Sequence, residues 1–337
     1  MSGGYKVFVT RMLPEPAIEK LRNAPEVAEV RINPHDRVIT REELIEGVRW
    51  CDALLCLLTD TVDAEVMDAN PNLKVIANYA VGFNNIDVAE ATKRKIPVTN
   101  TPGVLTETTA DLAWALMMAV ARRLNEAERF LRSGKWNGWG PMQFLGADVW
   151  GKVLGIVGFG RIGKAVARRA WGFDMRVIYY DYVRSDEEIE RALRATYVPF
   201  DELLQVADFV SIHVPLIMHG PNKTYHMFGD REFDLMKPTA FLINTSRGPV
   251  VDEKALVRAL KDGKIAGAGL DVYENEPSVE PELLEMENVV LLPHIGSATN
   301  ETRTRMALIA VENLLAALRG ERPPNVVNPE IYSAEAD

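Results

Sequence analysis

A glycine-rich sequence, GFGRIG at residues 158–163, directly follows the apolar run VLGIV at residues 153–157. A strand that leads through G-x-G-x-x-G into a helix is typical of a dinucleotide-binding fold. The first glycine permits a tight turn, the second lets a pyrophosphate approach, and the third lets helix and strand pack closely. The phosphates then bind free backbone N–H groups at the start of the helix. We therefore predict a dinucleotide site at Gly158, Gly160 and Gly163.

Asp181 stands at the end of the next predicted strand, residues 176–180. An acid at this place accepts hydrogen bonds from the ribose hydroxyls and repels a 2′-phosphate. We therefore predict that NAD(H) is favoured over NADP(H) as the cofactor. Arg184 follows closely in the sequence. A cation there keeps some use of NADP(H) possible.

Three later residues have side chains that could assist the reduction of a 2-keto acid. Arg247 (in NTSRG), Glu276 (in DVYENEP) and His294 (in PHIGS) each come shortly after a predicted strand, where ligands collect in open α/β sheets. The reaction needs a cation for the carboxylate and an acid for the carbonyl oxygen, while the cofactor carries the hydride. A guanidinium suits a planar carboxylate, and an imidazole exchanges protons near neutral pH.

Strands and helices alternate in two series, which indicates parallel sheets covered on both faces. The first series has predicted strands at residues 6–10, 53–58, 74–78 and 97–99, with helices at residues 16–23 and from the capping box at residues 40–43. The second has predicted strands at residues 153–157, 176–180, 209–212, 241–244, 268–272 and 289–291, and a helix over residues 299–318. Between the series we predict one long helix over residues 106–132, buried in the core or against a partner.

Composition excludes several classes of protein. The chain has 337 residues, is 47% hydrophobic and carries a net charge of −10, so we expect a globular protein that binds neither nucleic acid nor anionic lipid. Its longest apolar run, residues 112–121, is too short for a membrane span. No signal peptide is recognised, which favours a cytoplasmic location. Cys51 and Cys56 are interpreted as structural thiols, and the five histidines lack the paired spacing of a metal site.

The motifs together resemble the D-isomer-specific 2-hydroxyacid dehydrogenases, over about residues 6–328. Within that family, LLTD at residues 57–60 and VGFNNID at residues 81–87 most resemble glyoxylate/hydroxypyruvate reductases. The resemblance implies NAD(P)H-dependent reduction of glyoxylate or hydroxypyruvate to the D-2-hydroxy acid.

The resemblance also implies roles for individual residues. Arg247 would bind the substrate carboxylate, His294 would be the general acid/base, and Glu276 would orient the imidazole. Backbone amides near Val81 and Gly82 would complete the carboxylate site. Further cofactor contacts are implied at Thr109, Arg161, Ile162, Thr245, Asp271, Gly296 and Ser297. His226 is interpreted as structural, and residues 217–230, which are longer and more irregular than the usual family loop, receive no function.

The family's fold is two Rossmann-like or flavodoxin-like parallel-sheet domains. The substrate-binding domain would be discontinuous, residues 1–101 plus 295–337, with the NAD-binding Rossmann domain, residues 102–294, inserted into it. His294 would then lie at the hinge, and closure would bring the catalytic residues against the substrate.

The long helix and the Trp-rich stretch at residues 134–151 are interpreted as the arm of a homodimer. Trp139 would close the partner's substrate pocket, and Leu57 would line its opposite side. The alternative is that Trp139 only packs the interface between subunits.

Other members of the family remain as alternatives. A phosphoglycerate dehydrogenase with an added C-terminal domain is not expected, because only nine residues follow Asn328, but a short form stays possible. Phosphite dehydrogenase typically has lysine where Val81 stands, and D-lactate dehydrogenases tend to differ after the catalytic histidine. A dinucleotide-sensing corepressor on the same fold is a further alternative of a different class.

Overall fold

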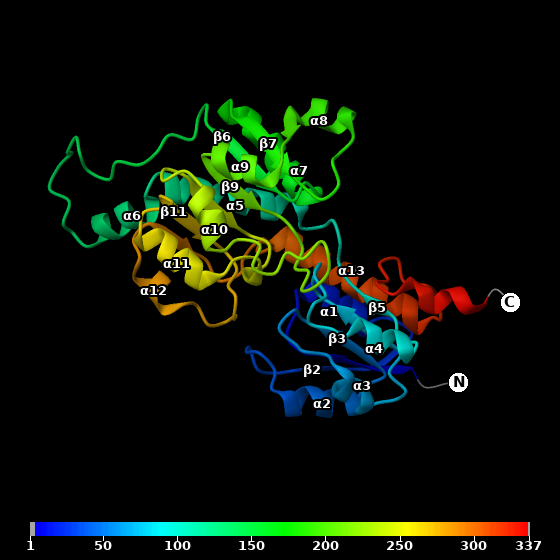
Figure 1. Cartoon of the computed structure of the whole chain (residues 1–337). Helices are drawn as coiled ribbons and strands as arrows, with labels where there is room; N and C mark the ends of the chain where they lie inside the picture. Colours follow the sequence, from blue (N-terminus) through cyan, green and yellow to red (C-terminus); the bar gives the residue numbers. More distant parts are fainter. Residues whose placement is uncertain (1–3, 336–337) are drawn as a thin grey trace. The chain divides into compact units, whose positions relative to one another are not determined.

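The computed structural model describes residues 4–335, which form two compact units. Of these residues, unit 1 comprises those up to Leu105 together with those from Ala298 onward, and unit 2 is Thr106–Ser297. Figure 1 shows strands flanked by helices in both units. The two parallel-sheet domains predicted from the sequence are therefore confirmed as the fold class. Within the described residues, no helix combines the length and apolar character needed to cross a membrane.

Unit 1 contains a five-stranded parallel sheet in the order β2-β1-β3-β4-β5, which is the flavodoxin-like order. Its strands are β1 Tyr5–Val9, β2 Val27–Ile32, β3 Ala53–Cys56, β4 Val75–Asn78 and β5 Val98–Thr99. Every residue of β3 and β4 is buried, as expected for central strands covered on both faces. The edge strand β2 was not predicted, because charged residues interrupt its apolar pattern and leave it largely exposed.

Helices cover both faces of this sheet. One face packs against α1 Glu15–Arg22 and α13 Asn300–Leu318, and the other against α2 Arg41–Trp50, α3 Ala64–Asp68 and α4 Val88–Lys93. Through α13, a C-terminal segment completes the core formed by the first hundred residues, with Ala307, Ala310 and Leu314 fully buried.

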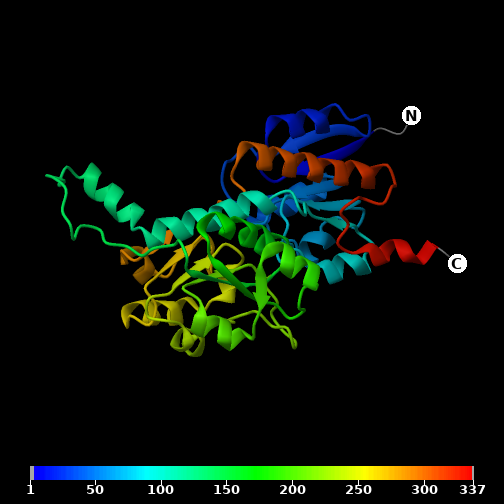
Figure 2. The same cartoon turned by 90° about the horizontal axis from the view of Figure 1, so that it is seen from above.

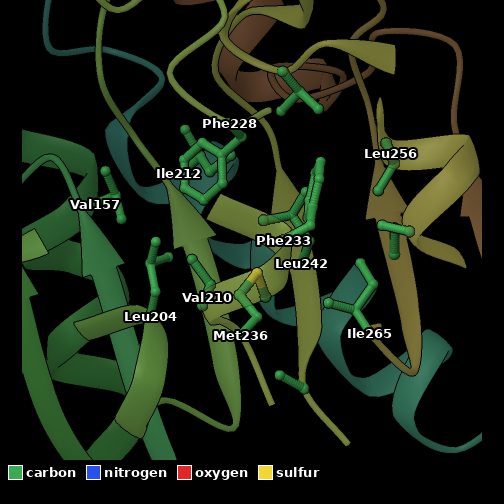
Figure 3. Packing of buried hydrophobic residues seen from close by; sticks show 14 of the residues in the cluster. Val157, Leu204, Val210, Ile212, Phe228, Phe233, Met236, Leu242, Leu256 and Ile265 are labelled. Atoms are coloured by element: carbon green, nitrogen blue, oxygen red, sulfur yellow. The ribbon is translucent and has the colours of Figure 1, made fainter. Parts of the chain in front are cut away.

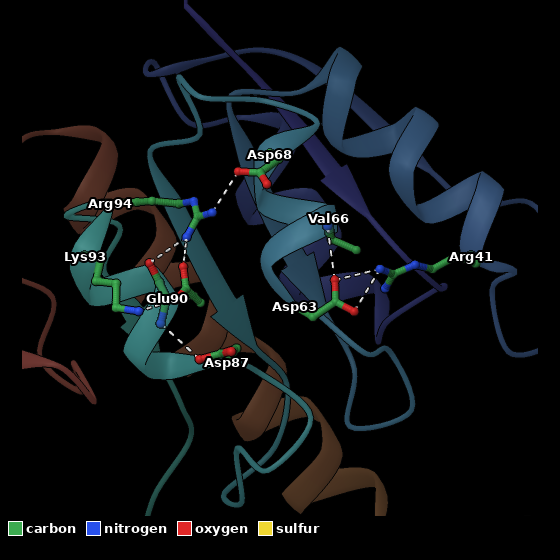
Figure 4. A network of polar contacts seen from close by, with 8 residues as sticks. All are labelled: Arg41, Asp63, Val66, Asp68, Asp87, Glu90, Lys93 and Arg94. Carbon is green, nitrogen blue, oxygen red and sulfur yellow. Dashed lines mark hydrogen bonds and ion pairs between the residues drawn. The ribbon is translucent and has the colours of Figure 1, made fainter.

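Side chains fix the starts of these helices. Thr40 forms the expected capping box with Glu43. Asp63 accepts a backbone hydrogen bond at the start of α3 and also pairs with Arg41, and Asp87 caps α4 (Figure 4). Each cap supplies a partner for a backbone N–H group that the first turn leaves unpaired.

Unit 2 contains a seven-stranded parallel sheet in the order β12-β11-β10-β9-β6-β7-β8. Its strands are β6 Val153–Val157, β7 Arg176–Tyr180, β8 Ala195–Tyr197, β9 Phe209–Ile212, β10 Phe241–Asn244, β11 Gly267–Leu270 and β12 Val289–Leu291. All six predicted strands are present, and β8 is an additional edge strand. The chain order reverses between β6 and β9, and such a switch point is where open α/β sheets bind ligands.

The sheet of unit 2 is also covered on both faces. Its helices are α5 Thr106–Ala121, α6 Leu124–Arg132, α7 Arg161–Arg169, α8 Glu187–Leu193, α9 Phe200–Val206, α10 Asp230–Leu235, α11 Glu253–Lys261 and α12 Pro281–Glu285. One apolar core lies under α9, α10 and α11, and Figure 3 shows Leu204, Phe228 and Phe233 in it. A second core lies under α5 and α7. Close packing on both faces fixes where each strand ends, and so where the side chains beyond it lie.

The prediction of a single helix over residues 106–132 is wrong. The structure has two helices, α5 and α6, separated by Arg122 and Arg123. Arg123 has a φ angle of 53°, and a left-handed residue interrupts a right-handed helix. Its guanidinium pairs with Glu126 in the first turn of α6, with nitrogen–oxygen distances of 2.7 and 2.8 Å. No residue of α6 is buried, and Figure 2 shows α6 and the segment after it extending from the body of unit 2.

Candidate active site

The glycine-rich turn lies at the switch point of the unit 2 sheet. Gly158 has a φ angle of 95°, and a Cβ atom there would lie 2.6 Å from the carbonyl carbon of His213. A Cβ atom on Gly163 would lie 2.2 Å from the Gly158 carbonyl oxygen, whereas one on Gly160 would meet nothing within 4 Å. Gly158 and Gly163 are therefore required by packing, and Gly160 leaves space for a ligand. No side chain caps the start of α7, so its first turn can bind an anion.

Asp181 lies beside this turn, at the end of β7. One carboxylate oxygen accepts from the backbone N–H of Phe159 at 2.7 Å, and the other accepts from Tyr182 at 2.7 Å. The residue is half-buried. The carboxylate is thus held against the glycine-rich turn, as required of an acid that contacts a ribose.

Two buried polar atoms near the ends of adjacent strands have no hydrogen-bond partner within residues 4–335. They are the Nδ1 nitrogen of His213, after β9, and the Oγ1 oxygen of Thr245, after β10. Buried polar groups almost always have partners, so an orphan indicates where a bound molecule can supply one. His213 was not predicted from the sequence, although its place after the strand beside β6 was a usable signal. With the glycine turn and Asp181, these atoms fit a dinucleotide.

Glu276 and His294 form the centre of the candidate catalytic site. Glu276 Oε2 lies 2.8 Å from His294 Nδ1, and Glu276 Oε1 accepts from the backbone N–H of Tyr273 at 3.0 Å. Burial raises the pKa of Glu276, but the hydrogen bond and the charge of His294 outweigh burial and leave it below its ordinary value. His294 has a φ angle of 55°, a rare conformation that occurs at functional sites. The imidazole is therefore oriented by a carboxylate, and its Nε2 is left for proton transfer.

Asp271 holds the backbone that follows His294. Its fully buried carboxylate accepts from Ile295 N at 2.7 Å and from Gly296 N at 2.8 Å. Thr109 on α5 donates to the carbonyl oxygen of Gly296 at 3.2 Å. Burial raises the pKa of Asp271, although these hydrogen bonds oppose the shift. Asp271, Thr109 and Gly296, predicted as cofactor contacts, thus form one structural unit that positions His294.

Arg247 is connected to the same site through the turn after β10. A Cβ atom on Gly248 would lie 1.8 Å from the carbonyl oxygen of Tyr273, so the turn packs directly on the segment that carries Glu276. Burial lowers the pKa of Arg247, and the nearby charge of Glu276 opposes that shift. Among the described residues, the guanidinium makes one hydrogen bond, from Nη1 to the Ser246 carbonyl at 2.7 Å. The remaining donors can bind a carboxylate.

His226 joins the irregular loop to the catalytic segment. Its Nε2 lies 2.5 Å from Glu274 Oε1, and its backbone N–H donates to Pro249 O at 2.8 Å. Glu274 Oε2 accepts from Glu253 N at 3.2 Å. His226 therefore links the segments that carry Arg247 and Glu276, and these contacts are consistent with its interpretation as a structural residue. No local sequence signal links residues so far apart in the chain.

The candidate residues of unit 1 lie in turns after β3 and β4. Leu57 donates its backbone N–H to the buried Asp60 carboxylate at 2.7 Å. The carbonyl oxygen of Val81 accepts from the Asn100 side chain at 2.8 Å, and that of Gly82 accepts from Asn78 at 2.9 Å. Both turns are thus fixed by side-chain amides and a carboxylate.

The other candidate residues of unit 2 are more exposed. Arg161 and Ile162 open α7, where Arg161 is exposed and Ile162 is half-buried. Ser297 is half-buried at the end of the unit. Trp139 lies in the segment after α6 with 84% of its surface exposed. The Trp139 side chain is therefore mostly in contact with solvent in the single chain.

The seven-stranded parallel sheet, its glycine turn and the histidine–carboxylate pair define a nicotinamide-dependent oxidoreductase. Comparison with known proteins supports this class. Residues 114–296 match the model described as "D-isomer specific 2-hydroxyacid dehydrogenase, NAD binding domain". The chain belongs to the D-isomer-specific 2-hydroxyacid dehydrogenase family, which confirms the resemblance seen in its motifs.

Individual relatives are similar over nearly their full length. A glyoxylate reductase of Korarchaeum cryptofilum is 56% identical over 97% of this chain and 96% of its own. The crystal structure of a glyoxylate reductase from Paecilomyes thermophila has a TM-score of 0.84 at 35% identity and covers 98% of this chain and 100% of that one. An NADPH-dependent glyoxylate/hydroxypyruvate reductase from Sinorhizobium meliloti, solved with NADP and malonate, has a TM-score of 0.82 at 34% identity, with 97% of each chain covered.

Proposed function

We propose that the protein reduces a small 2-keto acid, glyoxylate or hydroxypyruvate, to the D-2-hydroxy acid. The names of its relatives support glyoxylate as a substrate. The observation that carries the chemistry is the contact between Glu276 and His294, beside a turn that presents Arg247. We also propose a cytoplasmic location, which the free thiols of Cys51 and Cys56 support.

In this proposal, each catalytic residue has one task. Arg247 binds the substrate carboxylate through a charge-assisted, two-pronged contact and so orients the carbonyl group. A bound nicotinamide dinucleotide supplies the hydride. His294 Nε2 gives a proton to the carbonyl oxygen in reduction and removes it in oxidation. Glu276 stabilises the protonated imidazole and fixes its orientation.

We propose that the cofactor is bound by the glycine turn, Asp181 and the ends of the neighbouring strands. The wider set is Gly158, Gly160, Arg161, Ile162, Gly163, Asp181, Thr109, Thr245, Asp271, Gly296 and Ser297. The Asp181 carboxylate favours NADH, because it repels a 2′-phosphate. The NADPH dependence of the Sinorhizobium meliloti relative makes this preference a point for direct measurement.

Unit 1 is proposed to be the substrate-binding domain and unit 2 the NAD-binding domain. Backbone amides near Val81 and Gly82 would bind the substrate carboxylate, and Leu57 would line the pocket. The fixed turns that carry these residues support this role.

We further propose a homodimer in which α6 and the segment after it are the arm. All residues of α6 are at least partly exposed, including Leu124 and Leu131, and Trp136 and Trp139 are exposed beyond it. Apolar surface of this extent is typical of a protein–protein contact. Trp139 would then close the substrate pocket of the partner.

Turnover with a panel of acids tests the proposal. Glyoxylate, hydroxypyruvate, pyruvate and phosphohydroxypyruvate would each be assayed with NADH and with NADPH. We expect the highest kcat/KM with glyoxylate or hydroxypyruvate and NADH. A higher kcat/KM with pyruvate or phosphohydroxypyruvate would contradict the proposed substrate, and a higher value with NADPH would contradict the proposed cofactor.

A further inference from the structure

Arg184, the cation nearest to Asp181 in the sequence after β7, is already paired. Its Nε lies 2.9 Å from Glu190 Oε1 and its Nη2 lies 2.8 Å from Glu190 Oε2. This two-pronged contact matches a planar guanidinium to a planar carboxylate, which is the strongest common geometry for such a pair. The contact neutralises the charge of Arg184 and holds its guanidinium toward Glu190, although it uses only two of the five N–H donors.

The Glu190 carboxylate is held in place from a second side. Only 8% of the residue is exposed, and Oε1 also accepts from the Tyr179 hydroxyl at 2.6 Å. That hydroxyl in turn accepts from the backbone N–H of Ser185 at 2.9 Å. The hydrogen bonds from Arg184 and Tyr179 lower the pKa of Glu190 to about 2, so the carboxylate is charged at neutral pH. Glu190 therefore fixes both Arg184 and the backbone of the loop between β7 and α8.

The rest of this loop offers no substitute cation. In the sequence DYVRSDEEIE, residues 181–190, Arg184 is the sole basic residue among five acidic ones. A 2′-phosphate near Asp181 would meet a negative segment whose one positive charge is already neutralised.

We propose that Glu190 is a specificity-determining residue for the cofactor: by occupying Arg184, it withholds from a 2′-phosphate the cation that would bind it. Discrimination against NADP(H) then has two sources, repulsion by Asp181 and sequestration of Arg184 by Glu190. This inference rests on the proposed preference for NADH, and it places one determinant of that preference outside the ribose-binding carboxylate itself.

The test is the ratio of NADPH to NADH affinity in Glu190→Gln, measured as Kd by cofactor fluorescence and as kcat/KM with glyoxylate. The amide releases the Arg184 guanidinium, so we expect the ratio to rise roughly tenfold, the effect of one charge-assisted contact. Adding Arg184→Ala should return the ratio to its wild-type value. Glu188→Gln, which removes an exposed charge from the same helix, should leave the ratio near that of the wild type.

A second variant covers the case in which Glu190→Gln does not fold. Glu190→Asp keeps the charge but shortens the side chain, so a smaller rise in the ratio is expected. The inference would be overturned if the ratio of NADPH to NADH affinity were unchanged in whichever of these variants folds. It would also be overturned if the ratio rose and stayed raised when Arg184→Ala was added. The measurement of Kd needs no substrate, so it remains valid even if the proposed keto-acid substrate is incorrect. A wild type that prefers NADPH would contradict the proposed cofactor without changing the direction expected for the variants.

Discussion

Glu276 Oε2 lies 2.8 Å from His294 Nδ1, and this contact determines which nitrogen of the imidazole can act on a substrate. With Nδ1 engaged by the carboxylate, Nε2 is the nitrogen that transfers the proton in the proposed reaction. The backbone N–H groups that follow His294 are bonded to Asp271, so the orientation of the ring is determined from two sides. A positioned acid of this kind typically contributes about 10²–10⁴-fold to the rate.

Replacing Glu276 by Gln should change the pH dependence of the reaction. Reduction requires a protonated imidazole, and the carboxylate stabilises that form. In Glu276→Gln, kcat/KM for glyoxylate reduction should therefore begin to fall at a lower pH than in the wild type. Glu285→Gln, an exposed change in the same unit, is the matched control. A pH–rate profile of Glu276→Gln that overlays the wild-type profile would rule out this partnership.

Gly248→Ala should damage the site through packing alone. The new methyl group would lie 1.8 Å from the Tyr273 carbonyl oxygen, so the turn or the Glu276 segment must shift. We expect a loss of about 3 kcal/mol in the free energy of unfolding, the upper part of the range for overpacking. Gly172→Ala, where a Cβ atom meets nothing within 4 Å, should cost less than about 1 kcal/mol. Equal stability of the two variants in urea would show that the close approach is not present.

The sequence predicted those parts of the fold that have a local signal. The continuous apolar runs of the central strands and the glycine turn before α7 are such signals, and the family motifs supplied the catalytic candidates. The break at Arg123 carries none, because the left-handed conformation is normally signalled by Gly, Asn or Asp and arginine is none of these. The partner of His226 could not be predicted either, since its contact with Glu274 joins residues far apart in the chain and forms only after folding.

His213 should make the protein less stable in mild acid. Its Nδ1 is buried without a partner among the described residues, and burial lowers the pKa of His213 to about 3, against ~6.5 in the unfolded chain. Between these values the unfolded state binds more protons, so stability is lost as the pH falls below ~6.5. The slope is at most ~1.4 kcal/mol per pH unit.

Thermal unfolding of the cofactor-free protein at pH 7 and pH 4.5 measures this contribution. We expect the difference in Tm between the two pH values to be smaller in His213→Asn than in the wild type. His35→Asn, a change at an exposed histidine, should retain the full difference. The same difference in all three proteins would show that His213 does not resist protonation.

Trp139→Ala tests the arm and the pocket together. If Trp139 closes the partner's pocket, its loss should lower kcat/KM for glyoxylate and raise it for bulkier 2-keto acids, while the dimer persists in sedimentation. An unchanged ratio of the two kcat/KM values in a dimeric variant would leave Trp139 a purely structural residue. A wild type that sediments as a monomer at micromolar concentration would contradict the arm itself.

The most direct test of the proposed reaction is Arg247→Ala, with glyoxylate turnover and NADH binding measured on the same preparation. Two charge-assisted hydrogen bonds to the substrate carboxylate should together supply about 3 kcal/mol or more, so kcat/KM should fall at least roughly 100-fold. The Kd for NADH should stay within about twofold of wild type, and Arg258→Ala, on the surface of α11, should retain full activity. A variant that keeps half of the wild-type kcat/KM would contradict the assignment of Arg247 and the substrate chemistry built on it.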